Sequence, residues 1–218
     1  SSIADLMDEI IIVDTGSTDN TKEIAAQYTS RIYDFKWTSD FSAARNFSFS
    51  KATMEYIYTA DADEILDDAN RERFLRLKGA LLPEIEIVQM KYVTQGTFDT
   101  VLNAKKEYRP KLFRRLRTFT WIDPIHETVR LTPVTFDSDV EILHCPQSLH
   151  SKRDFSIFIK AFEHDGQFSP KIRTMYAKEL LKTGDKKDFT DAKPIFQLIF
   201  DNDPADDARK EAACVLAR

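Results

Sequence analysis

The sequence contains few cysteines and few glycines, and both shortages exclude classes of protein. Its two cysteines, Cys145 and Cys214, lie far apart and belong to no C-x-x-C pair or Cys/His cluster, which argues against a disulfide framework and a structural zinc site. With only five glycines, the chain contains neither a G-x-G-x-x-G nor a G-x-x-x-x-G-K motif. Dinucleotide-binding enzymes, P-loop enzymes and nucleotidyltransferases with a glycine- and lysine-rich phosphate loop are therefore disfavoured.

Long apolar runs and an excess of basic residues are also missing. No stretch approaches the roughly 18 consecutive apolar residues of a membrane-spanning helix, so any membrane contact is expected to be peripheral. The formal net charge of -5 argues against a general electrostatic grip on nucleic acid. Two thiols outside any disulfide pattern fit a reducing compartment. The sequence thus predicts a cytoplasmic protein, with association at a membrane surface left open.

What is present is an ordinary globular composition, with 42% hydrophobic and 31% charged residues among 218. Strand patterns alternate with helix patterns: apolar runs at 10–13 and 56–58 each precede a helix pattern, the first from Asn20 and the second over 71–82. This alternation predicts an α/β fold with a doubly wound, mostly parallel sheet. Beyond Pro83, alternating apolar residues predict further strands that extend the sheet in antiparallel fashion.

From Ser151 the pattern is helical to the end, so the chain is predicted to consist of an α/β domain at 1–150 and a small all-α tail at 151–218. Small, aromatic and terminating residues in the tail keep the spacing of a tetratricopeptide repeat. The segment 186–189 is expected to lengthen the connection between its helices by about three residues relative to that repeat. The positions that keep the spacing are Ala192, Phe196 and Pro204.

The first polar cluster, Asp14-Thr15-Gly16-Ser17-Thr18-Asp19, directly follows a predicted strand. In an open α/β sheet, ligands bind beyond the carboxyl ends of the strands. Glycine lets the backbone approach a ligand closely, and the short polar side chains can hydrogen-bond a nucleoside or a sugar hydroxyl. The same residue types are common in turns and helix caps, and Asn20 with Glu23 is a capping-box-like pair, so the cluster also fits a turn and a cap.

The second cluster, Asp61-Ala62-Asp63-Glu64, follows another predicted strand. If the backbone turns there, Asp61 and Asp63 can converge on one hard cation, for which Mg²⁺ or Mn²⁺ suits oxygen ligands. Such an ion can neutralise a leaving diphosphate and orient the bond that breaks. Alternatively, these acids, with Asp67 and Asp68, interact only with the dipole of the helix that follows.

Taken in order, three segments resemble glycosyltransferase family 2, in the branch of lipopolysaccharide-core-type transferases and the peptide S-glycosyltransferases of glycosylated bacteriocins. Two later segments resemble the arginine-rich strand and the His-Glu signature of that branch, and His144 resembles a further histidine before a helical tail. The resemblance covers nearly the whole chain. The three segments are Ile12-Val13-Asp14-Thr15-Gly16-Ser17-Thr18-Asp19-Asn20-Thr21, Asp40-Phe41-Ser42-Ala43-Ala44-Arg45-Asn46 and Asp61-Ala62-Asp63-Glu64; the later two are Arg109-Pro110-Lys111-Leu112-Phe113-Arg114 and Ile125-His126-Glu127.

The resemblance implies a GT-A fold that binds a nucleoside-diphosphate sugar, often a uridine one, together with a divalent ion. It implies that Asp14 and Arg45 contact the nucleoside, that Asp61 serves the ribose or the metal, and that Asp63 ligates the metal beneath the diphosphate. Thr15, Gly16 and Ser17 belong to the same nucleotide-sugar site.

Candidate catalytic residues also come from the resemblance. Glu127 is the preferred base, because a carboxylate there can accept the proton of the acceptor while the acceptor attacks the sugar carbon and inverts its configuration. Asp123, in the same loop, is the second candidate. His144 is a candidate metal ligand ahead of His126, although an isolated histidine is more often packed or at the surface. Arg109 and Arg114 are candidates to hold phosphate, with exposed strand arginines as the alternative.

One departure from the family pattern concerns the start of the chain. Members begin with a strand and an Asn-Glu-containing loop, and a helix follows that loop. Residues 1–7 of this chain resemble the end of that helix, so the first strand is expected to be missing. We therefore expect this chain to bind donor poorly or not at all, which calorimetric titration with several nucleotide sugars would test.

The predicted function is metal-dependent, inverting glycosyl transfer from a nucleoside-diphosphate sugar to a saccharide, lipid-linked or peptide acceptor. The alternative is a non-catalytic protein-interaction module built on a degenerate transferase core. Tetratricopeptide-like helices usually present protein-binding surfaces, so the tail could recruit a protein partner under either reading.

Overall fold

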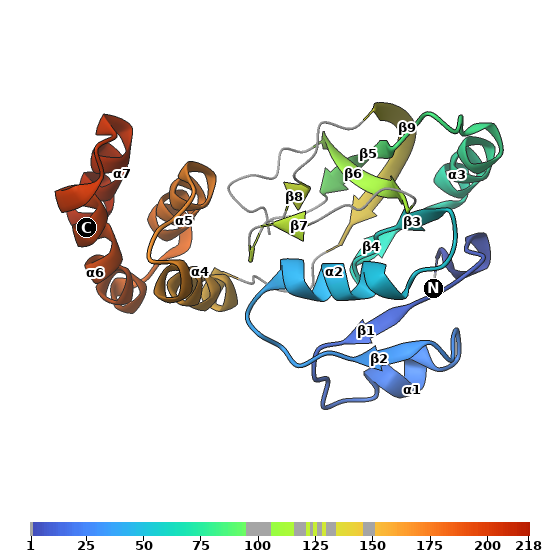
Figure 1. Cartoon of the computed structure of the whole chain (residues 1–218), viewed down its shortest axis with the longest axis horizontal. Helices are drawn as coiled ribbons and strands as arrows, with labels where there is room; N and C mark the ends of the chain where they lie inside the picture. Colours follow the sequence, from blue (N-terminus) through green and yellow to red (C-terminus); the bar gives the residue numbers. More distant parts are fainter. Residues whose placement is uncertain are drawn as a thin grey trace.

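The protein is described by a computed structural model that covers residues 2–94, 106–115, 121–122, 124–125, 128–129, 134–145 and 151–218. Strands and helices alternate in the first part of the chain, and four consecutive helices form the last part, on the opposite side of the molecule from the N-terminus (Figure 1). The predicted α/β class with a helical tail is confirmed. The predicted domain boundary at 150 falls among residues 146–150, which lie outside the described residues.

The first strand-turn-helix unit forms as predicted. Strands β1 (Ile12–Asp14) and β2 (Ile32–Asp34) are parallel neighbours, connected through helix α1 (Thr21–Ala25). The predicted capping box at the start of α1 is wrong, because the side chain of Asn20 makes no capping hydrogen bond. Asp19 accepts hydrogen bonds from the backbone N–H of Thr21 at 3.0 Å and from its hydroxyl at 2.5 Å instead.

A mixed five-stranded sheet contains the remaining long strands, in the order β3-β6-β5-β9-β4. The pairs β3–β6, β5–β6 and β4–β9 are antiparallel, as predicted for the strands beyond Pro83, whereas β5 and β9 are parallel. These five strands form a sheet of their own beside the β1–β2 pair. The short strands β7 (Trp121–Ile122) and β8 (Thr128–Val129) form a separate antiparallel pair. The bounds of the five strands are β3 Tyr56–Tyr58, β4 Glu64–Ile65, β5 Ile87–Thr94, β6 Lys106–Arg114 and β9 Thr135–His144.

One face of this sheet carries the core of the first part. Val88, Met90 and Tyr92 alternate along β5 and are buried, because successive side chains of a strand point to opposite faces. They pack in one cluster with Phe74 of helix α3 and with Leu6. Leu6 belongs to a short 3-10 helix, so the first residues of the chain are tied to α3. The bounds of these helices are Ala4–Leu6 for η1, Phe41–Lys51 for α2 and Asp68–Ala80 for α3.

The tail consists of α4 (Ser151–Asp165), α5 (Pro170–Thr183), α6 (Lys186–Asn202) and α7 (Asp206–Leu216). The predicted long connection between α5 and α6 is wrong, because segment 186–189 belongs to α6. Asp185 starts this helix early, since its carboxylate accepts hydrogen bonds from Lys187 N and Asp188 N, and the Asp188 carboxylate accepts one from Asp185 N.

The tail packs against the first part of the chain through a shared apolar cluster. Tyr176 and Phe196 are fully buried at its centre, while Trp37, Phe41 and Ile125 of the first part join it from outside the tail. A hydrogen bond of 2.9 Å from Lys160 Nζ to Ser39 Oγ connects α4 to the segment before α2. The helical tail and the beginning of α2 therefore share one hydrophobic core.

Candidate functional site

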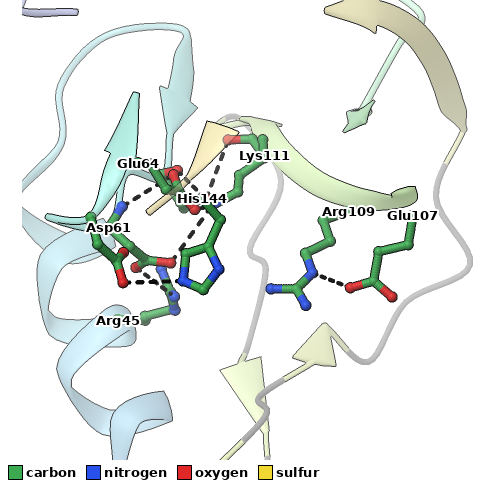
Figure 2. Close-up of polar contacts among 9 residues, drawn as sticks. Arg45, Asp61, Glu64, Glu107, Arg109, Lys111 and His144 are labelled. Atoms are coloured by element: carbon green, nitrogen blue, oxygen red, sulfur yellow. Dashed lines mark hydrogen bonds and ion pairs between the residues drawn. The ribbon is translucent and has the colours of Figure 1, made fainter. Parts of the chain in front are cut away.

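The acidic loop Asp61-Ala62-Asp63-Glu64 connects β3 to β4 and lies against the end of β9. Glu64 begins β4 and pairs in antiparallel register with His144, the last residue of β9. The backbone carbonyl of Asp63 also accepts a hydrogen bond from Cys145 N at 2.9 Å. These backbone contacts bring the predicted acids and the predicted histidine together, although about 80 positions separate them (Figure 2).

Asp61 is held between two cations. Its Oδ1 accepts a hydrogen bond from Arg45 Nη2 at 3.2 Å, and its Oδ2 lies 3.7 Å from Lys111 Nζ. The side chain of Asp61 is 43% exposed, yet the protein around it removes enough water to raise its pKa. The charges of Lys111 and Arg45 outweigh this effect and lower the pKa of Asp61 to about 2. Asp61 is therefore ionised throughout the physiological pH range, with its charge already matched.

Lys111 and Glu64 form a buried ion pair beneath the loop, with side chains only 5% and 3% exposed. Lys111 also donates a hydrogen bond to the carbonyl of Thr59 at 3.4 Å. Burial and the nearby charge of Asp61 raise the pKa of Glu64 to about 7, in opposition to Lys111. Lys111 is not among the predicted site residues, although it lies between Arg109 and Arg114 in the arginine-rich segment.

Asp63 and His144 form the second contact of the loop. His144 Nε2 lies 3.1 Å from Asp63 Oδ2, and the histidine ring packs 5.0 Å from the Tyr92 ring. Two adjacent ligands of one octahedral ion, with bonds of about 2.1 Å at a right angle, are separated by about 3.0 Å. Asp63 and His144 lie at hydrogen-bond distance, a separation that is also compatible with two adjacent ligands, and their donor types are ones that a divalent ion such as Mn²⁺ accepts.

The predicted set of three metal ligands does not come together as such. The described part of the chain contains no group of three or more His, Cys, Asp or Glu residues that could hold a metal ion. Asp61, predicted to ligate the metal with Asp63 and His144, faces Arg45 and Lys111 instead. Its sequence position did not reveal this difference, since both cations come from other elements.

The two predicted phosphate-binding arginines point to different neighbours. Arg109 stacks on the Tyr92 ring, with its guanidinium carbon 3.9 Å from the ring centroid, and forms an ion pair with Glu107. Figure 2 shows the Arg109–Glu107 pair apart from the group around Asp61 and His144. Arg114 donates to the carbonyl of Pro83 and lies 3.8 Å from Glu55, so it contacts the beginning of β3.

The loop after β1 is organised by Asp14, which is 5% exposed. Its carboxylate accepts hydrogen bonds of 3.1 Å from both Gly16 N and Ser17 N. Hydrogen bonds from Ser17 and Gly16 and the charge of Lys22 lower the pKa of Asp14 against the opposing effect of burial. Gly16 has a φ of 111°, a conformation that other residues rarely adopt. Thr15 and Ser17 of this loop are exposed.

The predicted bases Asp123 and Glu127 lie outside the described residues, as does His126. Their described neighbours lie beside α2: the carbonyl of Pro124 accepts a hydrogen bond of 2.9 Å from Phe41 N, and Ile125 is buried in the cluster shared with the tail. Phe41 begins the helix that carries Arg45 four residues further on.

Among the described residues, no helix is both long enough and apolar enough to cross a membrane. The predicted cytoplasmic location stays a prediction.

Comparison with known proteins places these features in a family. The SPbeta prophage-derived glycosyltransferase SunS of Bacillus subtilis is 31% identical over 113 residues, which are 50% of this chain and 26% of that protein. A TPR repeat-containing protein of Synechococcus elongatus is 44% identical over 66 residues, 30% of this chain and 16% of that protein. The chain thus spans well under a third of the length of either relative.

Among solved structures, S. aureus TarS 1-349 in complex with UDP-GlcNAc aligns with 88% of this chain and 71% of that chain, with a TM-score of 0.45 and 12% identity. The family match is broader than those to the two relatives. Residues 2–132, more than half of the chain and including both polar clusters, match Glycosyl transferase family 2. The chain therefore belongs to glycosyl transferase family 2.

Proposed function

We propose that this chain supplies most of the donor site of a metal-dependent, inverting glycosyltransferase that uses a nucleoside-diphosphate sugar, with uridine as the nucleoside. The observation that carries the proposal is the acidic loop after β3, where Asp61 is matched by cations while Asp63 lies beside His144. Membership of the family supports the reaction class.

The proposed roles follow from the contacts of the loop. Asp63 and His144 would hold the divalent ion, Mg²⁺ or Mn²⁺, and that ion would neutralise the charge that develops on the leaving diphosphate. Asp61, fixed by Arg45, would orient the ribose, since an ionised carboxylate accepts hydrogen bonds from hydroxyl groups. The loop from Asp14 to Ser17 would line the nucleoside side of the same site.

The proposed chemical step is an in-line displacement at the sugar carbon. An acceptor oxygen or sulfur forms the new bond, the bond to the diphosphate breaks, and the proton of the acceptor passes to a base. Glu127 is the proposed base, with Asp123 second. The acceptor is a saccharide, a lipid-linked sugar or a peptide, and the tail at 151–218 would help to position it or a protein partner.

The test is a donor-hydrolysis screen with the full-length protein across uridine, guanosine and cytidine sugars, each with Mn²⁺ or Mg²⁺. We expect hydrolysis of a uridine sugar by the wild type and at least a hundredfold loss in Asp63→Ala, as for the removal of one key electrostatic group. Asp139→Ala, an exposed acid on β9, is the matched control and should retain wild-type rates. Equal rates for Asp63→Ala and wild type would remove the metal assignment.

A second candidate function is a protein-interaction module on a degenerate transferase core. It is favoured by the lack of a three-ligand metal group among the described residues and by the cations that already match Asp61. Two results together would support this alternative. The full-length protein would hydrolyse no donor, and the intact chain would capture a protein through the surface of its tail.

A further inference from the structure

Lys111 is a charged side chain at a buried position of the sheet. Its side chain is 5% exposed and lies on β6, the strand between β3 and β5. Burying an ammonium group is costly unless charges and hydrogen bonds compensate it. Its partners are the carboxylate of Glu64, the Asp61 carboxylate at 3.7 Å and the Thr59 carbonyl at 3.4 Å. All three belong to the segment that carries the acidic loop.

The contacts of Lys111 make the two aspartates of the loop different. Both oxygens of Asp61 face cations, Oδ1 facing Arg45 and Oδ2 facing Lys111. Asp63 faces His144, and no ion pair with a lysine or arginine is found for it among the described residues. Among the described residues around the loop, three carboxylates therefore stand beside the two cations Arg45 and Lys111, and Asp63 is the carboxylate that neither cation contacts.

We propose that Lys111 is a positioning residue that neutralises Asp61 and Glu64 and thereby restricts divalent-ion binding to Asp63 and His144. This inference rests on the proposed function, because it concerns the ion of the same donor site. In this arrangement Asp61 orients the ribose and does not ligate the ion. Asp63 is then the carboxylate of the loop whose charge Arg45 and Lys111 do not neutralise.

The proposed role and a merely structural role of Lys111 predict opposite changes in the affinity for a divalent ion when Lys111 is removed. In Lys111→Met, Asp61 and Glu64 lose a shared cation, so the loop carries one more negative charge and attracts a divalent ion more strongly. If Lys111 only supported the fold, the same change would loosen the loop and weaken ion binding. Glu64→Gln removes one of the two carboxylates beside Lys111, so the surroundings of the loop become more positive and should bind a divalent ion more weakly.

The experiment measures Mn²⁺ binding to the 218-residue chain by electron paramagnetic resonance titration at pH 8. We expect Lys111→Met to lower the Kd for Mn²⁺ by about tenfold and Glu64→Gln to raise it by a similar factor, the order of magnitude for one unit charge near a divalent ion. The double variant Lys111→Met with Glu64→Gln restores the charge balance and should bind Mn²⁺ within about threefold of the wild type.

Two further variants serve as controls. Lys111→Arg keeps the charge and should retain the wild-type affinity, while Lys36→Met removes an exposed lysine and should change nothing. Losing one partner of a buried pair is destabilising. Thermal unfolding therefore accompanies each titration, and if Lys111→Met does not fold, Glu64→Gln and the double variant decide the question.

Unchanged or weaker Mn²⁺ binding in folded Lys111→Met, stronger binding in Glu64→Gln, or no Mn²⁺ binding by the wild type would each overturn the inference. Donor hydrolysis by the full-length protein separates this failure from that of the proposed function. The predicted order of Mn²⁺ affinities without hydrolysis of any donor would overturn the proposed function alone. Hydrolysis with the wrong order would overturn the role of Lys111 alone.

Discussion

Replacement of Tyr176 by phenylalanine should stabilise the protein, although deletion of a buried polar atom usually does the opposite. Tyr176 is 0% exposed at the centre of the tail. Its ring stacks on Phe158 at 4.7 Å and lies 5.4 Å from Phe196. Its hydroxyl oxygen is buried and has no hydrogen-bond partner among the described residues. Burial also raises the pKa of Tyr176, as expected for a hydroxyl surrounded by apolar rings.

The magnitude follows from two opposing effects. A buried, unsatisfied polar group costs about 1–3 kcal/mol, and Tyr176→Phe removes that cost. Deletion of one oxygen leaves a small void and loses its dispersion contacts, which offsets about 1 kcal/mol. The net expectation is a rise of about 1 kcal/mol in the free energy of unfolding, or about 2–4 °C in Tm for a chain of this size. Tyr176→Leu loses the ring contacts and should lower stability by about 2–4 kcal/mol.

Urea unfolding followed by circular dichroism at 222 nm measures both variants beside the wild type. The Leu variant is the control, since it shows that the assay detects the tail. A loss of more than about 1 kcal/mol in Tyr176→Phe would refute the reasoning, because it would show that the hydroxyl has a partner such as a buried water.

Three further outcomes are expected. Burial and the charge of Asp61 raise the pKa of Glu64 from 4.5 to about 7, so between these values the folded chain holds a proton that the unfolded chain releases. The stability that this proton contributes is complete below pH 4.5 and is lost as the pH rises through 7. Urea midpoints should show this decline in the wild type and not in Glu64→Gln. A Cβ on Gly184 would meet the Leu180 carbonyl oxygen at 2.6 Å, whereas one on Gly79 of α3 meets nothing within 4 Å; calorimetry should therefore show Gly184→Ala destabilised by about 1–3 kcal/mol and Gly79→Ala stabilised by up to about 1 kcal/mol, and equal effects would contradict the close approach. Trp37→Ala should lower stability by about 3 kcal/mol and speed the proteolytic release of the tail, and an unchanged cleavage rate would show that the shared cluster does not hold the tail.

Local patterns predicted those parts of the fold that depend on neighbouring residues. The period-two burial of Val88, Met90 and Tyr92 follows from strand geometry, and the unit from β1 to β2 follows from an apolar run that ends in a turn. The early start of α6 does not follow from the repeat-like spacing, because the capping box of Asp185 and Asp188 lies where that spacing places a connection. Capping pairs need side-chain geometry that composition does not provide.

The same limit applies to the candidate site. The position after a strand predicts the acids of the loop, the family resemblance adds His144, and the structure brings Asp63 and His144 together. The burial of Lys111 depends on cross-strand pairing with residues about 50 positions away, which no local period encodes. The different surroundings of Asp61 and Asp63 likewise depend on a residue distant in sequence, because Arg45 of helix α2 contacts Asp61.

The apolar cluster shared by Trp37, Phe41 and the tail has a consequence for altering acceptor choice. A chimera joined at residue 150 would set a foreign set of helices against an aromatic surface shaped for the native one, and would expose apolar side chains on both sides of the joint. Under the proposed role of the tail in positioning the acceptor, exchange of acceptor specificity between relatives requires that the beginning of α2 be transferred with the tail. Because α2 also carries Arg45, such a graft would alter the contact of Arg45 with Asp61, and with it the proposed donor site, together with the proposed acceptor surface.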